Sequence, residues 1–211
     1  MGVIQLRIWN LGPADWYDIQ IETANIQDAA AQRGWDRYHL YGFSAGATVA
    51  LAATLTNPDA VRSVAMFEPA SIGDDDWGPV ETRWRAELAQ VRILDPALRQ
   101  DAFRRMLMGD AEKLPAHLRP AQPWDALSDK LEDMLAGVGF DSVELGRIGQ
   151  PTLIMSGGRS AARFAAVADR LVQVMPNVKA ELMPDCSHLD LPHRSTPDQL
   201  RQTLFRLSDR S

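Results

Sequence analysis

The chain has 211 residues, of which 45% are hydrophobic and 24% are charged, and its formal net charge is −6 at pH 7. These values are typical of an ordinary globular protein with one domain, or one domain with a modest insertion. The acidic balance and the lack of a Lys/Arg cluster argue against a nucleic-acid-binding surface. The sequence has no run of 18 apolar residues and no charged-then-apolar leader, so we expect neither a membrane span nor a signal peptide.

The cysteine and glycine patterns limit the cofactors and the cellular compartment. The one cysteine, Cys186, excludes an internal disulfide and is typical of a reducing cytoplasm, which is the location we expect. No zinc-type spacing of Cys and His occurs, and no G-x-G-x-x-G segment follows an early strand. We therefore expect no metal and no nucleotide cofactor.

Strands and helices are predicted to alternate along most of the chain, from apolar periodicity and from Gly and Pro positions. The expected strands are Val3–Trp9, Arg37–Tyr41, Val61–Phe67, Pro151–Ser156 and Val178–Met183. The expected helices are Asp18–Arg33, Ala45–Thr56, Ala161–Met175 and a last one that begins at Thr196-Pro197. This alternation predicts an α/β fold with a mostly parallel sheet covered by helices on both faces.

Residues 71–149 interrupt the alternation. They contain three short helical patterns, separated by a Pro-rich turn over residues 114–124. We expect a core of residues 1–70 and 150–211, with 71–149 inserted as a helical cap that covers a substrate pocket, or as a structural excursion. Its large apolar residues either line an acyl pocket or pack the cap onto the sheet; these residues are Trp77, Trp84, Met106, Met108 and Trp124.

The segment Gly42-Phe43-Ser44-Ala45-Gly46 is the most informative motif of the chain. It follows a predicted strand and opens a predicted helix, which is the context of a G-x-S-x-G nucleophile elbow. The tight turn needs small residues two positions before and after Ser44. It holds the Ser44 hydroxyl at the positive end of the helix, where the N–H of Ala45 can donate to an oxyanion.

With this elbow, a helical insertion and a late His loop, the chain resembles the α/β-hydrolase fold superfamily. Similar hydrolases carry motifs like Phe67-Glu68-Pro69, Ser156–Ser160 and Pro192-His193-Arg194. The resemblance extends from Val3 to Leu207 but enters the fold late, so it implies that the first strands are missing and that the fold is shortened at its N-terminus.

The loop that donates the second oxyanion N–H in the superfamily would be missing as well. As a hypothesis, the half-exposed strand Val3–Trp9 occupies the vacant sheet edge beside the elbow strand. The loop Asn10–Pro13 would then supply a substitute donor to Ser44.

The resemblance and the chain order place the catalytic base in a late loop. His188, five residues after the last predicted strand, occupies the position of the superfamily's base. His193 is the competing candidate, since it lies only five residues further on. His39 is expected to be a packed or hydrogen-bonded strand residue, and His117 to be a solvated cap residue.

The acid departs from the common superfamily pattern, in which an aspartate closes a Gly-x-x-Asp turn. Here Ser160 has that place, and we expect it to be the N-cap of the following helix. Glu68, at the end of an apolar strand, is the predicted acid. A subgroup of the similar haloalkane dehalogenases takes its acid from this position, although their nucleophile is an aspartate. Asp185 and Asp190 are the alternatives.

The predicted function is hydrolysis of a small carboxylic ester, lactone or thioester through an acyl-enzyme on Ser44. His188 would act as base and then acid, Glu68 would orient it, and Ala45 would hold the oxyanion. The expected partner is a small-molecule substrate, with no nucleic acid and no membrane. Cofactor-free oxidation on the same triad is one alternative; another is a catalytically silent or truncated relative that binds a small molecule or a partner protein.

Overall fold

A computed structural model describes residues 2–12, 14–70, 72, 78–108 and 125–208 of the chain. Its centre is a four-stranded sheet in the order β1-β2-β3-β4, and all neighbouring strands are parallel. The strands are β1 (Tyr38–Phe43), β2 (Val61–Phe67), β3 (Thr152–Gly157) and β4 (Val178–Met183). These four strands confirm the predicted α/β fold with a parallel sheet.

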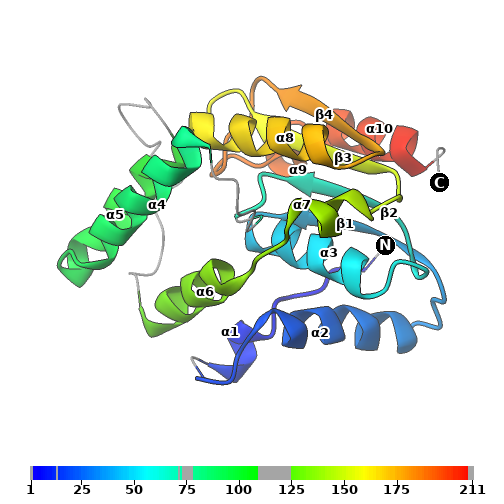
Figure 1. Cartoon of the computed structure of the whole chain (residues 1–211), viewed down its shortest axis with the longest axis horizontal. Helices are drawn as coiled ribbons and strands as arrows, with labels where there is room; N and C mark the ends of the chain where they lie inside the picture. Colours follow the sequence, from blue (N-terminus) through cyan, green and yellow to red (C-terminus); the bar gives the residue numbers. More distant parts are fainter. Residues whose placement is uncertain (1, 13, 71, 73–77, 109–124, 209–211) are drawn as a thin grey trace.

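The sheet lies between helices, as its apolar strands require (Figure 1). Successive side chains of β2 point to opposite faces, so Val64 and Met66 pack in one apolar cluster and Ala65 and Phe67 in another. The first cluster includes α3 (Ala45–Thr56) and α8 (Ala162–Val174), and the second includes α10 (Pro197–Ser208). Helix α2 (Ile19–Ala31) packs on α3. All four helices were predicted.

The described residues between β2 and β3, where the helical cap is expected, form four helices. They are α4 (Pro79–Arg92), α5 (Pro96–Met108), α6 (Ala126–Gly137) and the unpredicted short α7 (Ser142–Gly146). Figure 1 shows α4 and α5 side by side, away from the sheet; α4 packs on α8, and α6 contacts α3. The Pro-rich turn with His117, and both Trp77 and Trp124, lie outside the described residues. A role of this insertion in substrate choice stays a prediction.

The prediction of a strand over Val3–Trp9 is wrong. Residues 2–6 have no regular structure, and Ile8–Leu11 forms the short helix α1. The backbone N–H of Ile8 donates to the buried Glu22 carboxylate of α2 at 3.3 Å, and the Tyr17 hydroxyl also bonds this carboxylate. The segment is therefore held by a side chain and not by a strand ladder, which leaves β1 at the edge of the described sheet.

The proposed substitute oxyanion donor fails for a related reason. The backbone N–H groups of Asn10 and Leu11 both donate to the carbonyl of Arg7, and that of Gly12 donates to Ile8. These bonds form the turn of α1, so the three N–H groups already have acceptors.

Burial of Tyr17, together with its bond to Glu22, raises the pKa of the phenol far above its ordinary value.

Helix α2 offers a test of the local structure. The Asp18 carboxylate accepts from the N–H groups of Gln20 at 2.9 Å and Ile21 at 3.2 Å, and so caps the helix. We expect Asp18→Ala to lower the free energy of unfolding, measured with urea, by about 1 kcal/mol. Asp18→Asn retains an acceptor and should remain within about 0.5 kcal/mol of the native chain. Equal losses in both variants would contradict the capping role.

Candidate active site

The nucleophile elbow forms where the sequence predicts it, between β1 and α3. Ser44 has φ 51° and ψ −122°, a left-handed conformation that non-glycine residues rarely adopt. The Ser44 N–H donates to Phe67 at 3.0 Å, and the Ser44 carbonyl accepts from Ala47 at 2.9 Å. These bonds from β2 and α3 hold the strained turn.

The two motif glycines have different structural roles. A side chain on Gly42 would clash with the backbone of Gly46 and Ala47, so only glycine fits where the strand passes under the helix. A side chain on Gly46 would have no described atom within 4 Å. The expectation that both positions need a small residue is therefore correct for Gly42 and wrong for Gly46.

This difference gives a matched pair of variants within one motif. We expect Gly42→Ala to lower the free energy of unfolding by more than about 2 kcal/mol, because the elbow backbone must move. Gly46→Ala should change it by at most about 1 kcal/mol, since alanine favours a helix. Urea unfolding of both variants tests this, and similar losses would show that the elbow is less tightly packed than described.

The structure brings Ser44, Glu68 and His188 together. His188 Nε2 lies 3.0 Å from Ser44 Oγ, and His188 Nδ1 lies 2.8 Å from Glu68 Oε2. Ser44 follows β1, Glu68 follows β2 and His188 lies in the loop after β4, so all three are at the carboxyl edge of the parallel sheet. This is the nucleophile–base–acid arrangement predicted from the sequence; the catalytic roles stay predictions.

Glu68 is fully buried, with 0% of its surface exposed. A buried carboxylate is costly unless it is hydrogen-bonded. Glu68 Oε1 accepts from the N–H of Gly157 at 2.7 Å, and Oε2 contacts His188, so both oxygens have a partner. The residue has φ 50°, and its own N–H donates to Met155 at 3.0 Å. The backbone of β3 therefore holds the carboxylate in place.

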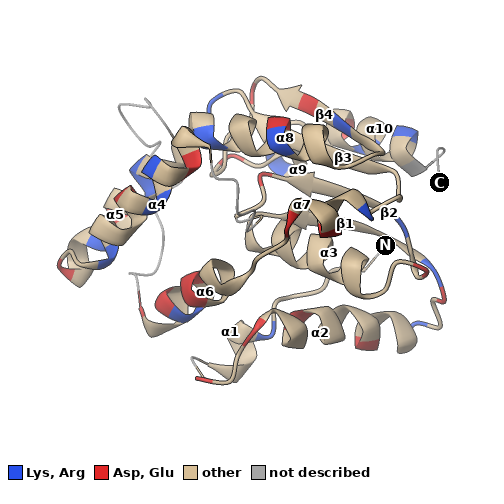
Figure 2. Cartoon of the chain, in the orientation of Figure 1, with Lys and Arg blue, Asp and Glu red and all other residues tan. Residues whose placement is uncertain are grey.

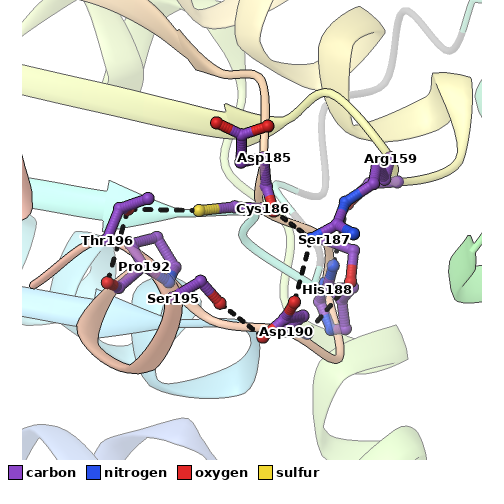
Figure 3. Close-up of polar contacts among 10 residues, drawn as sticks. Arg159, Asp185, Cys186, Ser187, His188, Asp190, Pro192, Ser195 and Thr196 are labelled. Carbon is purple, nitrogen blue, oxygen red and sulfur yellow. Dashed lines mark hydrogen bonds and ion pairs between the residues drawn. The ribbon is translucent and has the colours of Figure 1, made fainter. Parts of the chain in front are cut away.

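The loop that carries His188 is fixed by a network of polar contacts (Figure 3). Arg159 bonds the Asp185 carbonyl and pairs with Asp190 at 2.9 Å, and Asp190 also accepts from the hydroxyl of Ser195. Asp185 and Asp190, the alternative acids, thus shape the loop. His193 lies exposed in α9 (Pro192–Ser195), another short helix missing from the sequence prediction.

Ser160 does not cap the following helix, in contrast to the prediction. The N-cap of α8 is Ala161, which makes no side-chain capping bond. The Ser160 hydroxyl instead accepts from the backbone N–H of His188 at 2.8 Å. Sequence reasoning missed this contact, because it joins residues 28 positions apart and no local pattern marks it. Ser160 thus supports the base although it cannot supply the acid's charge.

The His188 ring contacts two aromatic rings. Phe164 stacks on it with ring centroids 4.5 Å apart and an angle of 13° between the planes, and Phe43 lies 4.9 Å away. Burial lowers the pKa of His188 below its usual value, although the Glu68 hydrogen bond and charge act in the opposite direction. A lowered pKa favours the neutral imidazole, which is the form that can accept a proton.

Ala45, the predicted oxyanion donor, lies where α3 and α6 are in contact. Ala45 is the first residue of α3, so its N–H has no partner within the helix. Met134 and Leu135 of α6 pack in one cluster with Ala45.

The charged residues are unevenly distributed over the helices. Helix α3 has no charged residue, whereas α4, α5 and α6 carry many (Figure 2).

Of the large apolar residues expected to line a pocket or pack the cap, the structure describes Trp84, Met106 and Met108. They are wholly or partly buried, and whether they also line a pocket stays a prediction. Trp84 and Met106 pack around Phe164 of α8, and Met108 is also buried. Among the described residues, no group of three or more His, Cys, Asp or Glu is arranged to hold a metal ion. No helix in the described part of the chain is long and apolar enough to cross a membrane.

Comparison with known proteins agrees with this architecture. The model of the alpha/beta hydrolase family matches residues 9–203, and the chain belongs to this family. A comparison with curated protein sequences gave no match.

Several solved structures have the same fold at low sequence identity. A probable hydrolytic enzyme from Pseudomonas aeruginosa has a TM-score of 0.64 at 18% identity, over 92% of this chain and 70% of that one. A carboxylesterase from Bacillus subtilis has a TM-score of 0.57 at 19% identity, over 90% of this chain and 66% of that one. A meta-cleavage product hydrolase from Pseudomonas fluorescens has a TM-score of 0.64 at 12% identity, over 94% of this chain and 75% of that one. The chain thus spans two thirds to three quarters of these structures, and the likeness concerns the fold alone.

Proposed function

We propose that the protein hydrolyses a small carboxylic ester, lactone or thioester through an acyl-enzyme on Ser44. The observation that supports this most strongly is the continuous hydrogen-bonded chain from Ser44 through His188 to the buried Glu68. A nucleophile in contact with a base, whose other nitrogen bonds an acid, is the arrangement that activates a serine hydroxyl.

In the proposed mechanism, His188 Nε2 takes the proton of Ser44 while Oγ attacks the carbonyl carbon. The charge that develops on the carbonyl oxygen is stabilised by the N–H of Ala45 and by the positive end of α3. The attack gives a tetrahedral intermediate, and its collapse expels the alcohol or thiol, which receives the proton from His188. Water then attacks the acyl-enzyme by the same steps, releases the acid and restores Ser44.

The surroundings of the site favour an uncharged, mostly apolar acyl group. Phe43 and Phe164 flank His188, and Met134 and Leu135 lie beside Ala45. A charged acyl group would lose its hydration against these side chains without gaining an ion-pair partner from them. The Bacillus subtilis neighbour is named a carboxylesterase, which agrees with this substrate class.

One observation favours the second candidate, a silent relative that binds a small molecule. The N–H groups of Asn10, Leu11 and Gly12 are engaged in α1, so the segment predicted to give a second oxyanion donor does not supply one. Loss of one donor typically reduces the rate by about 10²–10³. A slow hydrolase and a silent relative are therefore the two outcomes to separate.

Labelling with a fluorophosphonate separates them, because this reagent reacts with serines activated by a neighbouring base. We expect the native chain to gain the mass of one phosphonyl group at Ser44, measured as intact mass. Ser44→Ala and His188→Ala should remain unlabelled, because one lacks the nucleophile and the other the base. His193→Ala, which changes the competing histidine, should label like the native chain.

Each result decides between the two candidates. Complete labelling of the native chain, lost in Ser44→Ala, supports a serine hydrolase with a working base. If the folded native chain stays unlabelled, or if Ser44→Ala labels equally, the proposed hydrolase function is wrong and the binding protein is favoured.

A further inference from the structure

Arg163 is a buried cation in the first turn of α8, with only 3% of its surface exposed. Its guanidinium forms a bidentate ion pair with Glu81 of α4, through Nε at 2.7 Å and Nη2 at 3.1 Å. Two-point pairing of this kind fixes the orientation of both side chains. One end of the inserted helix α4 is thereby tied to the core of the protein.

The same guanidinium also contacts the backbone turn that carries the acid. Arg163 Nη2 donates to the carbonyl of Ala70, two residues after Glu68. The N–H of Ala70 in turn donates to the carbonyl of Ser44 at 3.3 Å. Arg163 is therefore linked to the elbow through one residue, Ala70, which lies two positions after Glu68.

Aromatic contacts extend from Arg163 to the base. The guanidinium carbon lies 4.7 Å from the ring centroid of Trp84 in α4 and 5.3 Å from that of Phe164. Phe164 is the ring that stacks on His188. Cations over aromatic faces are attractive, and more so when both groups are buried. Movement of Arg163 would thus release the ring that holds the imidazole.

We propose that Arg163 is a positioning residue for His188, which couples the inserted helix α4 to the base through the Glu81 ion pair and the Phe164 ring. This inference rests on the proposed hydrolase function for its catalytic meaning. No motif marks Arg163 in the sequence, because its polar partners come from α4 and from the turn after β2.

The proposal has an electrostatic consequence that a purely structural role would lack. Two charged groups act on His188 from the elements around it: Glu68 after β2 raises its pKa, and Arg163 of α8 lowers it. The charge of Arg163 is opposed by Glu81 and also by Glu132 of α6. Burial raises the pKa of Glu132 to about 7. Removal of Arg163 should raise the pKa of His188, whereas removal of Glu81 alone should lower it, since the charge of Arg163 is then less strongly opposed.

The pKa of His188 can be measured by NMR as the pH dependence of its imidazole Cε1–H signal, assigned with His188→Gln. The double variant Arg163→Met/Glu81→Met replaces the buried pair by apolar side chains of similar size, which proteins often tolerate. We expect its His188 to titrate roughly 0.5 pH unit or more above the native value. In Glu81→Gln, we expect a shift of the opposite sign.

A control variant removes an ion pair of α4 whose arginine is not among the groups that shift the pKa of His188. Arg92 pairs with Asp133 at 2.5 Å on the exposed side of the insertion. Arg92→Met should leave the His188 titration unchanged within about 0.2 unit. Thermal unfolding of each variant confirms that the chain is folded, and if the double variant is unfolded, Glu81→Gln carries the test alone.

The results separate this inference from the proposed function. Opposite shifts in the two Arg163–Glu81 variants, with none in Arg92→Met, support the coupling even if fluorophosphonate labelling fails. Unchanged titration in the folded variants overturns the role of Arg163, whether or not Ser44 is labelled. For an active enzyme, kcat for p-nitrophenyl acetate should fall at least tenfold in the double variant and stay within twofold in Arg92→Met.

Discussion

The hydrogen bond between Glu68 and His188 is the interaction on which the rest of the site depends. A carboxylate with no exposed surface cannot be hydrated, so it must find donors inside the protein. It finds two, the N–H of Gly157 and the Nδ1–H of His188. Because a carboxylate can only accept a hydrogen bond, we assign the proton of the neutral imidazole to Nδ1, which leaves Nε2 as an acceptor that faces Ser44. One buried charge thus sets both the orientation and the tautomer of the base.

The parallel sheet makes this bond possible by bringing three strand ends together. Strand β2 lies between β1 and β3, so Glu68 at its end is next to the elbow and next to Gly157. Close packing then places the base: a side chain on Gly157 would lie 2.5 Å from the carbonyl oxygen of Cys186, in the His188 loop. The loop can approach the acid only because this position has no side chain. Arg163 and Phe164 contribute the remaining support from α8.

Much of this could be predicted from the sequence, where the signals are local. The elbow and four of the five predicted strands follow from local motifs and periodicity, whereas the positions of Glu68 and His188 also required the resemblance to the superfamily. The prediction of a strand over Val3–Trp9 is wrong because the alternation of apolar and polar residues does not reveal that the Glu22 side chain accepts a hydrogen bond from the N–H of Ile8. Contacts between distant segments, such as those of Ser160 and Arg163, leave no trace in local patterns. These contacts decide how the base is held, and only the three-dimensional structure shows them.

The proposed role of Glu68 as the acid can be tested by measuring kcat/KM for p-nitrophenyl acetate. We expect Glu68→Gln to lower kcat/KM by about 10³–10⁴, because the amide cannot stabilise the imidazolium. Asp190→Asn, which changes the alternative acid in the His188 loop, should stay within about tenfold of the native chain. A folded Glu68→Gln protein within tenfold of native activity, or a larger loss in Asp190→Asn, would show that Glu68 is not the acid.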